Sequence, residues 1–238
     1  MAGIACLACL VTELSMAIPA MAILPPHGPN LADETSGLQD KLFLMRSNIK
    51  ERIDAQVQIP NLTDKIIRLE DPDFIKPDID RSKLSAEKIA LIEREVARHR
   101  LHILATFLYR RGTLLAVLGD NEKAMSDLGA ALNSDSNYAP AYNNRACLKA
   151  SEGDFDGALA DANKALTLAP NFVEAYDTRG AVYLAKKQYQ KARLDFDHAI
   201  AARPAYAEAF YHRALLMKAL GKESDWQTDF QKAKQLGY

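Results

Sequence analysis

The feature that most restricts the fold of this chain is a repeat of 34 residues. Four segments align without a gap when they begin at Ala105, Ala139, Val173 and Ala207. Such a period indicates stacked supersecondary units, because one unit cannot bury its apolar face alone. The fourth position holds Leu108, Tyr142, Tyr176 and Phe210, the seventh holds Arg111, Arg145, Arg179 and Arg213, and the eighth holds Gly112, Ala146, Gly180 and Ala214. The twentieth holds Ala124, Ala158, Ala192 and Trp226, the twenty-third holds Asp127, Asp161, Asp195 and Asp229, and the twenty-seventh holds Ala131, Ala165, Ala199 and Ala233.

Each segment is predicted to form two helices joined by a turn. Glycines such as Gly119 and Gly153 lie where the first helix ends, a place that favours a positive φ. Small residues at the eighth, twentieth and twenty-seventh positions let the helices approach closely. Pro170 and Pro204 end the second helices of the two middle units, because a proline ring clashes with a continuing helix.

Arginine at the seventh position and aspartate at the twenty-third recur in all four segments. They fall on opposite helices of one hairpin, so we predict an ion pair that locks each hairpin. The alternative is a row of arginines that receives an acidic partner. That alternative is weaker, since every arginine has an aspartate of its own.

These columns resemble the tetratricopeptide repeat (TPR) family over about residues 105–238. The resemblance implies an all-α fold, an α-α superhelix or TPR solenoid of four helix-turn-helix repeats with an N-terminal helical extension. The TPR domain would span 85–238, with Ser85 capping the extension and Glu87 in its first turn. Trp226 and Ser136 depart from the family's small residue and closing proline. The repeats would be 105–138, 139–172, 173–206 and 207–238.

The resemblance also implies that the first helices line a concave groove that binds a protein or peptide partner. One subfamily grips the C-terminal carboxylate of chaperone tails with Lys, Asn and Arg. Here only Asn144 matches, and Glu174 would repel a carboxylate, so we reject that activity. Tyrosine and asparagine suit contacts with a peptide. The groove positions hold Tyr109, Arg110, Thr113, Asn143, Asn144, Cys147, Glu174, Asp177, Thr178, Glu208, Tyr211 and His212.

Residues 1–26 form an apolar leader like a signal peptide. Ala20-Met21-Ala22 supplies the small residues that a signal peptidase needs, and Pro19 breaks the helix before them. No Lys or Arg precedes the apolar core, and Glu13 interrupts it. We expect an exported protein, periplasmic in a bacterial cell envelope; the alternative is a cytoplasmic protein.

Residues 27–84 are predicted to be a linker with one amphipathic helix at about 38–57. Its apolar residues recur at steps of three and four from Leu38 to Ile53. This stripe either docks on the repeats or pairs with a second copy as a homodimer. Residues 58–81 contain Pro60, Pro72 and Pro77 and are predicted to be an extended connector.

Composition and motifs disfavour most other functions. With 30 basic and 31 acidic residues, the net charge of −1 gives no field that would attract nucleic acid. No run of 18 uncharged apolar residues follows the leader, so we expect no membrane insertion of the body. Neither a GxxxxGK loop nor a GxSxG elbow occurs. We therefore expect a non-catalytic scaffold or adaptor with no cofactor or metal. The alternatives are a self-associating structural protein that uses the 38–57 helix, and a metal-dependent enzyme built on His99 and His102.

Overall fold

The computed structural model describes residues 49–71 and 84–238, and within them all regular structure is helical. The predicted leader 1–26 and the first part of the predicted linker, 27–48, lie outside the described residues. The described residues form two compact units, which divide between Ser136 and Asn137. The helices are α3 (Ile49–Glu70), α4 (Ala86–Leu118) and α5 (Asn121–Ser134) in the first unit, and α6 (Ala139–Ser151), α7 (Phe155–Leu168), α8 (Val173–Ala185), α9 (Tyr189–Ala202), α10 (Ala207–Ala219) and α11 (Glu223–Gln235) in the second.

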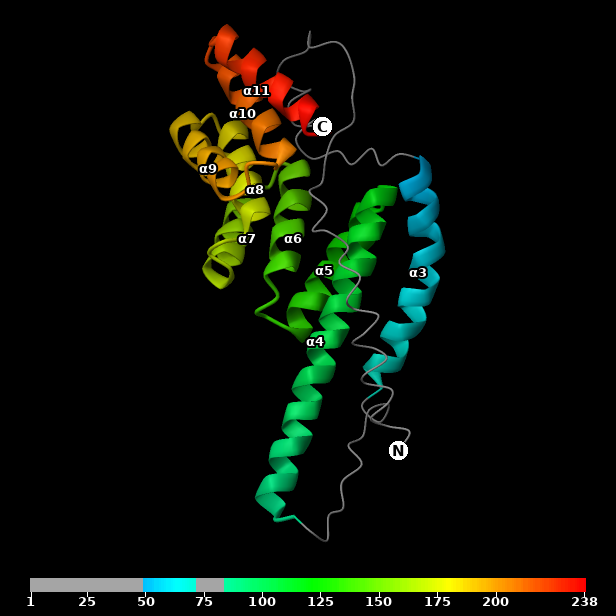
Figure 1. The fold of residues 1–238 in the computed structure, drawn as a ribbon. Helices are drawn as coiled ribbons and strands as arrows, with labels where there is room; N and C mark the ends of the chain where they lie inside the picture. The colour runs from blue at the N-terminus through cyan, green and yellow to red at the C-terminus, as the bar shows by residue number, and fades with distance from the viewer. Residues whose placement is uncertain (1–48, 72–83) are drawn as a thin grey trace. The chain divides into compact units, whose positions relative to one another are not determined.

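In the first unit, α3 and α4 lie side by side and run in opposite directions, and α5 packs on the C-terminal part of α4 (Figure 1). Ser85 caps the N-terminus of α4, and its side chain accepts a hydrogen bond from the backbone N–H of Lys88, as predicted. It continues without a break into the first helix of the 105–138 repeat. By length and composition α4 is apolar enough to cross a membrane, but 61% of its apolar window is buried inside the structure. Packing against α3 and α5 accounts for this apolar character.

The prediction that residues 58–81 form an extended connector is wrong for residues 58–70, which are helical and belong to α3. Pro60 lies inside this helix, where it removes one backbone donor. The helix continues because the residues beyond Pro60 include Leu62, Ile66 and Leu69, which are at most 5% exposed. This apolar stripe packs on α4, and its burial outweighs the local cost of the proline. The predicted stripe from Leu38 to Ile53 lies outside the residues whose side chains the structure describes, so its docking or self-pairing stays a prediction.

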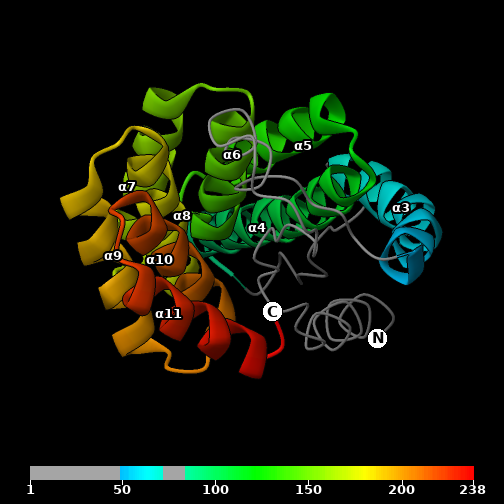
Figure 2. The same cartoon turned by 90° about the horizontal axis from the view of Figure 1, so that it is seen from above.

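The second unit consists of three helical hairpins, α6–α7, α8–α9 and α10–α11. In Figure 2, α6, α8 and α10 follow one another on one side, while α7 and α9 lie on the other. Alanines fill the places where helices meet, as the repeat columns predict. At the twenty-seventh position of all four repeats the alanine is completely buried. The closing prolines also lie just beyond the ends of α7 and α9.

The predicted ion pair is present in all four hairpins. The Nε and Nη2 atoms of each arginine donate to the two carboxylate oxygens of its aspartate at 2.7–2.8 Å. This two-bond geometry is the strongest that an arginine makes with a carboxylate. The aspartate side chains are only 7–10% exposed. The pairs are Arg111–Asp127, Arg145–Asp161, Arg179–Asp195 and Arg213–Asp229.

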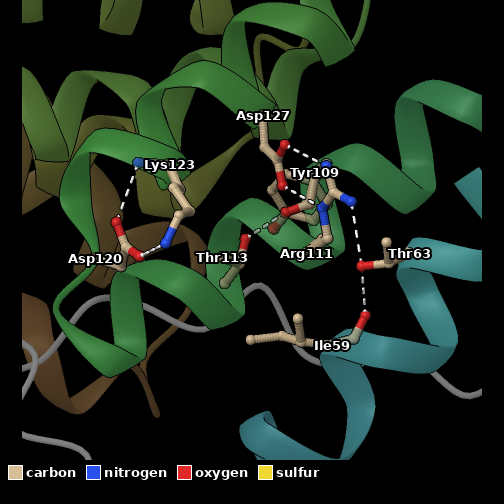
Figure 3. Close-up of polar contacts among 8 residues, drawn as sticks. All are labelled: Ile59, Thr63, Tyr109, Arg111, Thr113, Asp120, Lys123 and Asp127. Carbon is tan, nitrogen blue, oxygen red and sulfur yellow. Dashed lines mark hydrogen bonds and ion pairs between the residues drawn. The ribbon is translucent and has the colours of Figure 1, made fainter.

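The third nitrogen of the arginine, Nη1, reaches the preceding helix, which the repeat columns did not predict. Arg179 donates from Nη1 to Asn163 at 2.8 Å, and Arg213 donates to Asp197 at 2.7 Å. Both acceptors occupy the twenty-fifth position of the preceding repeat. In the first unit, Thr63 of α3 takes this role and accepts from Arg111 at 3.2 Å (Figure 3). The helix α3 therefore supplies to Arg111 the hydrogen bond that the preceding repeat supplies to Arg179 and to Arg213.

Two glycines of the first unit give a prediction about stability. Gly129 lies inside α5 with open space where a Cβ would stand, whereas Gly119 ends α4 with φ +84°. We expect Gly129→Ala to stabilise the unit by about 0.5–1 kcal/mol, because alanine favours a helix. We expect Gly119→Ala to destabilise it by about 1 kcal/mol, because that backbone conformation strains an L-residue. Urea unfolding of the two variants measures both effects, and a loss of stability in Gly129→Ala would contradict this account of α5.

Candidate partner-binding face

The candidate site is a row of polar side chains on the first helices α6, α8 and α10 of the second unit. We call it the first-helix face. It contains nine residues at the repeat positions predicted to face a partner: Asn143, Asn144, Cys147, Glu174, Asp177, Thr178, Glu208, Tyr211 and His212.

Polar contacts connect these residues from one first helix to the next. The Cys147 sulfur on α6 lies 3.4 Å from the Thr178 hydroxyl on α8. Asp177, also on α8, lies with its two carboxylate oxygens 2.8 and 2.9 Å from His212 Nδ1 on α10. The structure thus brings residues of three repeats into one connected surface. Of the ten predicted site residues, these repeats provide Asn143, Asn144, Asp177, Thr178, Glu208, Tyr211 and His212.

Most of this face is more buried than a freely exposed groove would be. Asn143, Asn144, Asp177 and His212 are each 4% exposed, while Glu208 and Tyr211 are partly exposed. Their binding of a partner stays a prediction. The three remaining predicted residues, Tyr109, Arg110 and Thr113, lie on α4 in the first unit; Thr113 is buried and donates to the Tyr109 carbonyl (Figure 3).

Two buried polar atoms of the first-helix face lack a hydrogen-bond partner within the described part of the chain. They are Asn143 Oδ1 on α6 and His212 Nε2 on α10. A buried polar atom without a partner costs free energy, about 1–3 kcal/mol. Such atoms are rare in folded proteins and call for an explanation in each case. Both atoms lie below the surface, so a partner on this face would not touch them unless the side chains around them move.

Charges are concentrated where α8 meets α10. Glu174 accepts a bond from Arg203 Nη1 at 2.6 Å, so its charge is offset. Arg203 and the buried Tyr206 were not predicted, since they lie between α9 and α10 where no repeat column marks them. Glu174 was expected to repel a carboxylate; with Arg203 beside it, that repulsion is reduced.

The protonation of His212 depends on its neighbours. Burial by itself lowers its pKa, but the charge and hydrogen bond of Asp177, together with the charge of Glu208, outweigh burial and raise the pKa above 6.5. The carboxylate accepts from Nδ1, so the imidazolium form is favoured.

Glu208 itself has a raised pKa, mainly because of burial and then because of the charge of Asp177. Burial also raises the pKa of Cys147 to about 12, which makes this thiol unreactive.

This arrangement predicts how stability changes with pH. A raised folded-state pKa means that the His212–Asp177 pair contributes fully below the unfolded pKa of about 6.5 and that the contribution is lost as pH rises through the folded value. We expect the free energy of unfolding to fall between pH 6 and pH 9 by more in the wild type than in His212→Gln. Urea unfolding at several pH values measures the difference, and parallel curves for the two proteins would rule out a titrating pair.

The alternative prediction was a metal site at His99 and His102, and the structure gives these two side chains different surroundings. His102 Nδ1 lies 2.6 Å from an oxygen of Asp135, while His99 is exposed. In residues 49–71 and 84–238 no three His, Cys, Asp or Glu side chains are grouped so that they could hold a metal ion.

Comparisons with known proteins agree with this fold. The family model described as tetratricopeptide repeat matches residues 139–172 and 173–206. The chain is similar to the crystal structure of TTC0263, a thermophilic TPR protein of Thermus thermophilus, at 18% identity over 63% of this chain and 87% of that chain, with a TM-score of 0.52. It is also similar to a TPR protein from Parabacteroides merdae (21% identity, 74% of this chain and 65% of that chain, TM-score 0.49) and to the Arabidopsis OM64 TPR domain (25%, 48% and 95%, TM-score 0.46). No curated protein sequence matches the chain.

Proposed function

This chain belongs to the tetratricopeptide repeat family, and from that premise we propose that it is a non-catalytic adaptor that binds a segment of a partner protein on the first-helix face. Repeats of this family form scaffolds for protein–protein interaction. The observation that most supports the proposal is that polar side chains of three first helices join into one face, in a region whose residues 139–206 match the tetratricopeptide repeat. Its partly exposed members include Tyr211, and tyrosine suits contacts with a peptide.

A pull-down from the native cell extract tests this function. The bait is the wild-type chain, compared with a double variant, Asn144→Ala with Tyr211→Ala, and with a control variant, Leu194→Ala. Leu194 lies on α9 and is 69% exposed, so the control removes a side chain away from the face. We expect the double variant to lose a partner that both the wild type and the control retain. Recovery of the same partners by all three baits would place binding elsewhere.

We further propose that the protein acts in a bacterial cell envelope after export. The small residues of Ala20-Met21-Ala22 and the apolar stretch before them support cleavage after Ala22. The mass of the protein isolated from its native cells tests this proposal. A mature chain that begins at Ile23, found in the periplasmic fraction, is the expected result. An uncleaved chain in the cytoplasmic fraction would contradict it.

A further inference from the structure

The helix α11 carries two aromatic rings at repeat positions that are covered in the other repeats. At the twentieth and twenty-fourth positions of the first three repeats, every side chain is completely buried. Trp226 and Phe230 occupy these positions in the fourth repeat, and both are partly exposed. The buried residues of the first three repeats are Ala124, Ala158 and Ala192 at the twentieth position, and Leu128, Ala162 and Phe196 at the twenty-fourth.

In the second unit, the cover over these positions comes from the first helix of the next repeat. Ala162 of α7 packs in one cluster with Val182 of α8, and Phe196 of α9 packs in another with Leu216 of α10. Val182 and Leu216 both hold the tenth position of their repeats. Figure 2 shows α11 at the edge of the second unit, and no helix follows it in the described part of the chain. The two rings of α11 therefore lack the cover that their equivalents have.

Charged side chains flank the two rings on the same side of α11. The ring centroids of Trp226 and Phe230 are 5.5 Å apart, and Lys234 Nζ lies 4.7 Å from the Phe230 centroid. Glu223 lies one helical turn before Trp226 and accepts a hydrogen bond from Gln227 of its own helix. Glu223 and Lys234 are exposed, and neither forms an ion pair within residues 49–71 and 84–238. We call Glu223, Trp226, Phe230 and Lys234 the α11 face.

The α11 face is complementary to itself when two copies lie antiparallel. A two-fold axis near Thr228 places Glu223 of each copy opposite the Lys234 of the other, and Trp226 opposite Phe230. Each of these contacts then occurs twice, as in an isologous dimer. A parallel arrangement would instead bring like charges together. The order of charges along the helix therefore favours a second copy of the chain as the occupant of this face.

We propose that two copies of the chain form a dimer in which each α11 face covers the other. The proposal is independent of partner binding on the first-helix face, which lies on other helices. Four rings of about 150–250 Å² each supply less than the roughly 1,200 Å² at which stable interfaces begin. We therefore expect a weak dimer, with a dissociation constant on the order of 10 µM.

Sedimentation velocity of the full chain tests the proposal over concentrations from well below to well above that value. We expect the mass to rise from monomer to dimer. Trp226 is the one tryptophan of the chain, so its fluorescence should shift to shorter wavelength over the same range as the ring leaves water. A chain that stays monomeric would overturn the proposal. If its emission were then at short wavelength throughout, a segment of the same chain would be the cover.

Reversing the charges tests the antiparallel arrangement itself. Glu223→Lys and Lys234→Glu each bring like charges together, so each variant alone should dimerise at least about tenfold more weakly. An equal mixture of the two variants should form a mixed dimer, because the opposite charges face one another again. Lys164→Glu reverses an exposed charge on α7 and should dimerise like the wild type.

Equal circular-dichroism spectra and melting temperatures establish that these variants are folded. Dimers that persist in both single variants would place the interface elsewhere, for example on the helix predicted at 38–57, and would overturn the proposal. Two monomeric variants whose mixture also stays monomeric would contradict the pairing of Glu223 with Lys234.

Discussion

Replacing Asp195 with alanine is expected to destabilise the second unit by about 3 kcal/mol. Asp195 is 5% exposed and accepts from Nε and Nη2 of Arg179 at 2.8 and 2.7 Å. Its removal leaves a guanidinium, 22% exposed, next to the empty place of its counterion. The loss is close to the lower limit for a broken buried pair, because part of Arg179 remains in water. It also removes the bond by which α8 holds α9.

A matched control is available in the same unit. Asp156 forms an ion pair with Lys186 at 2.6 Å, but its side chain is 89% exposed. Asp156→Ala is expected to cost less than about 1 kcal/mol, since water replaces the lost contact. Urea unfolding, followed by circular dichroism, measures both variants. Similar losses in Asp195→Ala and Asp156→Ala would show that the repeated pairs do not lock the hairpins.

The second large effect concerns Phe196 on α9, which is completely buried in a cluster with Leu184 of α8 and Leu216 of α10. Phe196→Ala is expected to cost about 3–5 kcal/mol, because it removes a large apolar side chain and leaves a cavity. The facing residue is Gly180, where an added Cβ would lie 2.6 Å from Phe196 Cε1. Gly180→Ala alone is therefore expected to cost about 1 kcal/mol, because overpacking outweighs the better helix propensity of alanine.

The sign of the Gly180→Ala effect is expected to reverse when Phe196 has already been replaced by alanine. In that background the new methyl group enters the cavity, and the helix propensity of alanine adds about 1 kcal/mol of stability. Alanine at both positions would reproduce a combination that the preceding repeat already has, Ala146 with Ala162. A double-mutant cycle measured by urea unfolding tests the reversal. The same sign in both backgrounds would mean that Gly180 is not small to accommodate Phe196.

Much of the fold could be predicted from the sequence because each structural position of a repeat occurs several times in the chain, with the same type of residue each time. The arginine and the aspartate of the ion pair recur at a constant spacing in four repeats, so the pairing of Arg179 with Asp195 follows from four equivalent observations rather than one. The cap at Ser85 and the glycine turn at Gly119 follow from local chemistry in the same way.

The extent of α3 could not be predicted, because the local effect of Pro60 opposes a burial that only the packed unit provides. Leu62, Ile66 and Leu69 form a stripe after the proline, but nothing in the sequence says that α4 is there to cover it. The bonds from arginine Nη1 to the preceding helix were missed for another reason. Asn163 and Asp197 share the twenty-fifth position, yet Gly129 occupies it in the first repeat, so that column shows no common residue type.

The candidate site was predicted as a set of positions, without its contacts. The column pattern selected Asp177 and His212 separately, and their hydrogen bond depends on the offset between neighbouring repeats. Arg203 was missed because loop residues before a closing proline have no fixed role in the pattern. The deep burial of Asn143 was also not foreseen, since the family resemblance implies an open groove.

The sharpest test of partner binding on the first-helix face is a site-specific photocrosslink in the native cells. A photoreactive phenylalanine analogue is placed at Tyr211, on the face, or at Leu194, exposed on α9. Mass spectrometry then identifies what each position captures after irradiation. We expect a specific partner protein crosslinked at position 211 and absent at position 194. Capture of the partner at position 194 with none at position 211 would show that the first-helix face is not where it binds.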